Sequence, residues 1–85
     1  MKIRTVRFGD SEVEVVDFED VTVAERVIEF RCRNDPKISS FAAVVIPDGG
    51  DWSAALLGVD PRVGDISAAL MARLIEVARE LIEVR

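Results

Sequence analysis

Seven carboxylates lie between residues 10 and 25 with no basic residue among them. They are the residues of this sequence that most resemble a catalytic or metal-binding set. Paired carboxylates can transfer protons in acid–base catalysis, and their oxygens can coordinate Mg²⁺ or Ca²⁺. The spacing lacks the alternating Asp/Asn ligands, central glycine and terminal glutamate of a calcium-binding loop. We therefore expect no metal and no cofactor, and an enzyme that works through a carboxylate-bound metal is the least favoured function. The seven are Asp10, Glu12, Glu14, Asp17, Glu19, Asp20 and Glu25.

The remaining reactive side chains form no catalytic pattern. The chain has no histidine, and its single cysteine, Cys32, therefore lacks the usual base that activates a thiol nucleophile. Cys32 alternates with Ile28 and Phe30, which predicts a buried, inert thiol, and a single cysteine excludes an internal disulfide. The loop from Pro47 to Asp51 lacks the Lys-Ser/Thr pair of a phosphate-binding loop. The sequence thus predicts no catalytic residue and a protein that is not an enzyme.

Two interpretations of the acidic stretch stay open. Basic residues lie in the segments on either side, namely Lys2, Arg4 and Arg7 before it and Arg26, Arg31 and Arg33 after it. If these segments are neighbouring strands, the charges pair across the sheet, each pair contributing a few tenths of a kcal/mol. Alternatively, an inhibitor or antitoxin-like protein would use an acidic face to bind a basic protein that handles nucleic acid. The residues assigned to that face are Glu12, Glu14, Asp17, Glu19 and Asp20.

Length and composition indicate one globular domain spanning residues 1–85. Of the 85 residues, 49% are hydrophobic and 32% are charged, which is typical of a folded domain rather than of a disordered chain. The net charge of −5 argues against direct binding to nucleic acid, since that binding requires clustered Lys and Arg. No apolar run has the length of a signal peptide or of a membrane span, so we expect a cytoplasmic protein that does not bind membranes.

The clearest periodicity in the sequence predicts an amphipathic helix over about residues 65–84. Asp65 is the expected N-cap, because its carboxylate can accept from free backbone N–H groups and complement the helix dipole. At about 100° per residue, the apolar side chains occupy one half of the helix, an arc of about 180° that is wider than packing on one sheet requires. Those apolar residues are Ile66, Leu70, Met71, Leu74, Ile75, Val77, Ala78, Leu81, Ile82 and Val84.

Alternating and continuous apolar runs upstream predict strands over about residues 2–8, 12–20, 25–33, 39–46 and 52–58. The phase shift at Val15 and Val16 predicts a β-bulge in the second strand. Residues 39–46 are apolar on both faces, which is typical of a central strand covered from both sides. The last segment has a helical alternative, with Asp51 as its N-cap and Gly58 just past its end. The expected fold is α+β: an antiparallel meander of four to five strands with one C-terminal helix on one face.

Two apolar surfaces exceed what one small domain is expected to cover. One is a flank of the helix, for which a strongly curved sheet is the alternative explanation, and the other is the second face of the central strand. We therefore expect a small acidic interaction module that acts by protein–protein contact, either as a homodimer or with another protein. The residues assigned to the interface are Met71, Ile75, Ala78 and Ile82.

Overall fold

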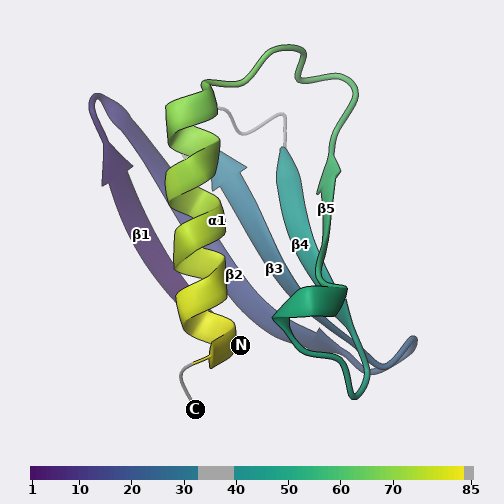
Figure 1. Cartoon of the computed structure of the whole chain (residues 1–85). Helices are drawn as coiled ribbons and strands as arrows, with labels where there is room; N and C mark the ends of the chain where they lie inside the picture. The colour runs from purple at the N-terminus through teal and green to yellow at the C-terminus, as the bar shows by residue number, and fades with distance from the viewer. Residues whose placement is uncertain (33–39, 84–85) are drawn as a thin grey trace.

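A computed structural model describes residues 1–32 and 40–83, and it shows a five-stranded sheet with one helix across it (Figure 1). The strands pair antiparallel in chain order, so that β1 and β5 are the two edges of the sheet. The α+β class predicted from the sequence is confirmed. The elements are β1 (Lys2–Phe8), β2 (Ser11–Asp20), β3 (Glu25–Cys32), β4 (Ala42–Pro47), the 3₁₀ turn η1 (Trp52–Ala54), β5 (Leu56–Val59) and α1 (Ala68–Glu83).

Strand β2 pairs with both of its neighbours without interruption, so the predicted β-bulge is wrong. Its register against β3 runs pair by pair from Val13 to Asp20. Val15 and Val16 therefore point to opposite faces of the sheet, as consecutive residues of a regular strand must. Both are nevertheless 1% exposed, because β2 is apolar on both faces at its centre. The sequence signal that suggested a bulge instead reflects burial on two sides.

The segment after β4 divides into a turn and a strand. Asp51 caps η1, and its carboxylate accepts a hydrogen bond from the Ser53 backbone N–H at 3.0 Å. The chain becomes extended again at Ala55 and forms the short edge strand β5. The strand predicted over residues 52–58 is thus correct for its second half, whereas the helical alternative correctly places the cap and the first turn. Residues 33 and 39, at the ends of two predicted strands, lie outside the described residues.

Helix α1 begins at Ala68, three residues later than predicted, and Asp65 is not its cap. The Ser67 hydroxyl accepts a hydrogen bond from the Leu70 N–H at 3.2 Å, and the Ser67 carbonyl accepts the first helical bond, from Met71, at 3.0 Å. Serine is as good an N-cap as aspartate, so composition alone does not choose between the two positions. The predicted C-terminal residue, Val84, lies outside the described residues.

The core lies between α1 and the face of the sheet that the helix covers. Phe30 and Ile28 from β3 are fully buried there, as are Leu74, Val77 and Ala78 from α1. The cross-strand row on the covered face runs Asp17, Ile28, Val44 and Leu57, and a second row runs Val15, Phe30, Ala42 and Val59. The opposite side, which we name the open face, carries the intervening residues of each strand.

Candidate interaction surfaces

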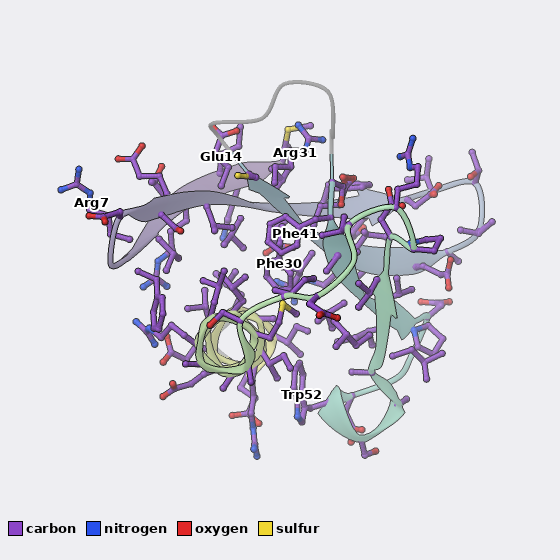
Figure 2. All side chains as sticks on the ribbon, turned by 90° about the horizontal axis from the view of Figure 1, so that it is seen from above. Arg7, Glu14, Phe30, Arg31, Phe41 and Trp52 are labelled. Carbon is purple, nitrogen blue, oxygen red and sulfur yellow. The ribbon has the colours of Figure 1, made fainter. Side chains whose placement is uncertain are left out.

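The predicted interface stripe on α1 is largely occupied by the protein's own core. Ala78 is 0% exposed, and Met71 and Ile82 are half-buried against the core cluster. Ile75 is half-buried too, and it lines an apolar cavity of about 200 Å³ with Val44, Trp52, Ala55, Leu56 and Leu57. Trp52 and the linker residue Val63 pack against the core cluster, and Figure 2 shows Trp52 beside the helix, so part of the wide apolar arc is covered from the side as well as by the sheet. The use of this stripe as an interface stays a prediction.

The five acids assigned to one face divide between the two faces of the sheet. Because β2 has no bulge, residues of even number point to the open face and residues of odd number to the covered face. Glu14 lies on the open face opposite Arg31, and Figure 2 shows both on the side of the sheet away from the helix. On the strand's alternation, Glu12 and Asp20 share that face, whereas Asp17 and Glu19 are on the other.

Asp17 and Arg26 form the most buried ion pair among the described residues. The Asp17 side chain is 9% exposed and that of Arg26 is 31% exposed. The guanidinium donates through Nε at 3.1 Å and through Nη2 at 2.7 Å, and Nη2 also donates to the Leu81 carbonyl of α1 at 3.0 Å. The hydrogen bonds to Asp17 raise the pKa of Arg26. This pair ties β2 and β3 to the C-terminal turn of α1, which is a structural role.

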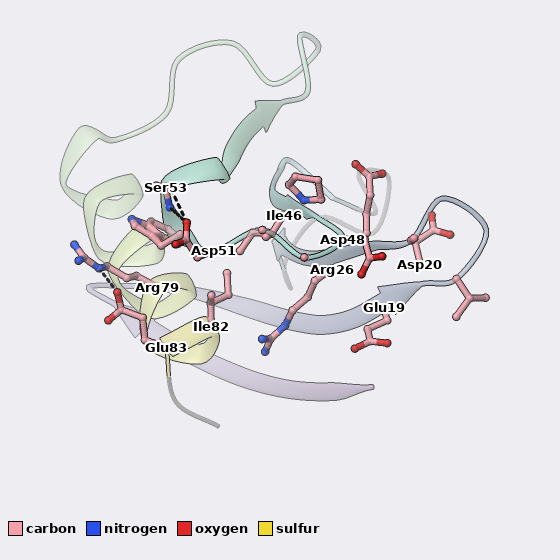
Figure 3. A pocket seen from close by; sticks show the side chains of 17 residues that line it. Glu19, Asp20, Arg26, Ile46, Asp48, Asp51, Ser53, Arg79, Ile82 and Glu83 are labelled. Carbon is pink, nitrogen blue, oxygen red and sulfur yellow. Dashed lines mark hydrogen bonds and ion pairs between the residues drawn. The ribbon is translucent and has the colours of Figure 1, made fainter.

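An acidic hollow of about 990 Å³ lies where the β2–β3 and β4–η1 turns approach the end of α1 (Figure 3). Its two arginines are already engaged, Arg26 with Asp17 and Arg79 with Glu83 at 2.8 Å. Apolar side chains from Ile46, Trp52 and Ile82 line it as well. Glu19 and Asp20, from the predicted acidic face, are therefore brought together with acids that the sequence did not connect to them. The carboxylates lining the hollow are Glu19, Asp20, Glu25, Asp48, Asp51 and Glu83.

Two carboxylates of the hollow are held ionised by the turns in which they lie. The Thr22 hydroxyl and backbone N–H donate to Asp20 and lower its pKa. The Ser53 hydroxyl and N–H do the same to Asp51, and its pKa is lowered too. Both pKa shifts run in the direction that keeps negative charge on the hollow in mildly acidic solution.

The open face carries an apolar row that crosses four strands. Phe18, Val27, Val45 and Leu56 are directly opposite one another from β2 to β5, and Leu56 is 69% exposed. The adjacent row adds Ile3 and Ala43 around Glu29, with Ile3 61% exposed at the far edge, whereas Val16 in the same row is 1% exposed. No described helix or strand covers this side. The two-sided apolar pattern of residues 39–46 signalled this surface in the sequence, but the neighbouring strands that extend it could be identified only from the register.

The two edges of the sheet differ in charge. Strand β1 carries Lys2, Arg4 and Arg7, whereas β5 has no charged residue over Leu56–Val59. On β5, Leu57 is 46% exposed and Val59 is 47% exposed, in addition to Leu56. An uncharged, apolar edge strand is a template for pairing with another strand, since its outward backbone groups have no partner in the sheet.

Residues 1–32 and 40–83 contain no group of three or more Cys, His, Asp or Glu side chains placed to hold a metal ion. Cys32 is half-buried against the core, more exposed than predicted. Over the same residues, no helix is long and apolar enough to cross a membrane.

The protein is a two-layer α+β domain whose helix covers one face of the sheet and whose other face carries an apolar row among charged side chains. Comparison with protein-family models, with curated proteins and with solved structures finds no match to this chain. The surfaces described above are therefore the basis on which its function is inferred.

Proposed function

We propose that this protein is a non-enzymatic interaction module that associates with a second copy of itself through the apolar surface of its sheet. The observation that carries the proposal is the row of Phe18, Val27, Val45 and Leu56 on the open face. Contiguous apolar surface of this kind on a small soluble domain marks an interaction site, because leaving it in water costs free energy.

The distribution of charge supports a second copy as the partner. Each chain carries a net charge of −5, so two copies repel one another wherever their acidic surfaces meet. The apolar row and the β5 edge beside it contain no charged side chain, which makes them the part of the surface where two copies can approach at least electrostatic cost. A two-fold symmetric contact between identical patches is the commonest arrangement for such a pair.

Sedimentation equilibrium over a wide protein concentration range tests the proposal. We expect a reversible monomer–dimer equilibrium that high salt leaves intact or strengthens, because salt screens the repulsion between acidic chains and does not weaken apolar contact. The variant Val45→Lys, on the open face, should shift the equilibrium toward monomer. The double variant Ile75→Glu/Ile82→Glu makes the corresponding test of the helix stripe, which the sequence predicts as an interface. A wild-type protein that stays monomeric at all concentrations contradicts the proposal.

A second candidate function is favoured by the acidic hollow: binding of a basic protein, as an inhibitor or antitoxin-like protein would. The support is that six carboxylates line the hollow while both of its arginines are engaged. Titration of an arginine-rich peptide should give affinity that falls steeply with salt and falls further in Glu19→Lys than in Glu14→Lys. The second variant makes the same change of charge on the open face. Equal effects of the two variants would mean that the hollow is not the binding site.

A further inference from the structure

The direction of the backbone groups on β5 can be derived from one hydrogen bond at its end. The Asp60 N–H donates to the Phe41 carbonyl at 2.9 Å, which places residue 60 opposite residue 41 in the β4–β5 register. In an antiparallel pair, alternate residues turn both backbone groups toward the partner strand. Leu56 and Gly58 therefore bond toward β4, whereas Leu57 and Val59 direct their N–H and C=O groups away from the sheet.

These outward groups form a self-complementary set. Each copy of β5 offers two donors and two acceptors, from Leu57 and Val59, and these residues are about half exposed. A second β5 strand, antiparallel and centred on Gly58, would place Leu57 opposite Val59 of the partner subunit and the reverse. That register satisfies all the outward groups of both strands, and the missing side chain of Gly58, whose Cβ position has no neighbour within 4 Å, leaves room at the centre.

We propose that β5 pairs antiparallel with β5 of a second copy about a two-fold axis through Gly58, joining the two five-stranded sheets into one continuous sheet. The inference rests on the self-association in the proposed function and places the contact at the β5 edge, beside the open face. A two-fold axis relating adjacent antiparallel strands is perpendicular to the sheet, so both helices lie on the same side. In this register Leu56 lies opposite Asp60 of the partner subunit, and the open-face row that continues across the axis is that of Ala43 and Gly58.

Charge and symmetry select this contact over the other edge. Pairing of β5 with β1 of another copy would be head-to-tail, which gives rings or filaments rather than a two-fold dimer, and Lys2, Arg4 and Arg7 make β1 a poor apolar partner. A four-residue strand gives a contact smaller than the roughly 1,200–2,000 Å² of stable protein interfaces, so we expect a concentration-dependent dimer rather than an obligate one.

Amide hydrogen exchange measured by NMR at low and high protein concentration tests the register in the wild-type protein. The proposal expects the Leu57 and Val59 amides to become about 10-fold or more protected as the dimer forms, because those N–H groups acquire a partner. The Leu56 and Gly58 amides, already directed to β4, should change little by comparison. A dimer in which Leu57 and Val59 exchange as they do in the monomer overturns this inference and leaves the proposed function standing.

Two variants provide an independent measurement. Val59→Pro removes an outward donor without removing a bond to β4, and Leu57→Lys places a charge on the edge. Each should raise the dimer dissociation constant by about 10-fold or more, while the circular dichroism spectrum is retained. Ile3→Lys adds the same charge at a comparably exposed apolar residue on the opposite edge and should have a smaller effect. If Ile3→Lys weakens the dimer as much as Leu57→Lys, the β5 contact is wrong, and a wild-type monomer refutes the proposed function itself.

Discussion

Removing Arg26 should destabilise the protein more than removing Asp17, because Asp17 is the more buried partner of this ion pair. Asp17 is 9% exposed, so Arg26→Leu leaves a carboxylate without its two donors in a site that water hardly reaches. Breaking a buried ion pair in this way costs about 3–5 kcal/mol of unfolding free energy. In Asp17→Val the guanidinium that remains is 31% exposed and keeps its bond to the Leu81 carbonyl, so the cost should be about 1–2 kcal/mol.

The double variant Asp17→Val/Arg26→Leu completes the test. Both groups are then apolar, and replacement of a buried pair by hydrophobic residues is often neutral. We expect the double variant to be about 3–5 kcal/mol more stable than Arg26→Leu alone, which is a coupling that distant residues do not show. A domain of this length has a total unfolding free energy of roughly 4–13 kcal/mol, so the loss in Arg26→Leu is a large and measurable fraction of it.

Urea unfolding followed by Trp52 fluorescence and circular dichroism at neutral pH measures these differences. With a slope of about 1 kcal/mol per M for a small domain, Arg26→Leu should lower the midpoint by about 3 M or more and Asp17→Val by about 1–2 M. The protein is kept dilute, since dimer formation would add a concentration-dependent term. Equal costs for the two single variants, or strict additivity in the double variant, would show that the carboxylate is not desolvated and would refute the reasoning.

Two further predictions concern local bonds. Ser67→Ala should lower the unfolding free energy by about 1 kcal/mol through loss of the α1 cap, and Asp65→Ala should lower it by about 0.5 kcal/mol or less. A larger loss in Asp65→Ala than in Ser67→Ala, measured by urea unfolding, would mean that Asp65 is the cap. The bonds from Arg62 lower the pKa of Asp60 to about 2 from 3.8, so their stabilisation is present above pH 3.8 and is lost as the pH falls through about 2. Arg62→Ala should therefore destabilise the protein at pH 7 but not below pH 2, and an equal loss at both values would mean that Arg62 acts otherwise.

The elements that the sequence predicted well are those with a local periodic signal. The alternation in β1 to β3 and the helical period of α1 depend only on which side chains neighbour one another along the chain. The choice of Ser67 over Asp65 as cap was not predictable in the same way. Both residues can cap a helix with similar preference, so residue type does not decide between the two positions.

The failed β-bulge explains why the predicted acidic face does not exist as one surface. A bulge at Val15 and Val16 would have placed Glu12, Glu14, Asp17 and Glu19 on a single side of β2. The uninterrupted register instead sends the first two to the open face and the last two to the covered face. The hollow that does gather acids draws them from strand ends, a turn and the end of α1, far apart in the sequence, and no spacing rule connects Glu19 with Asp51 or Glu83.

The surplus apolar surface expected from the sequence lies mainly on the sheet rather than on the helix. One helix can cover one face of the sheet, and here Leu74, Val77 and Ala78 are buried against that face while Trp52 packs against the same core. The other face keeps its apolar row because the residues that form it alternate with those of the core on the same strands. A strand apolar on both sides is costly for a two-layer domain unless something covers the second side, and β5 ends that row at an uncharged edge. Leu56 belongs both to that uncovered row and to the edge strand at which a second sheet can join.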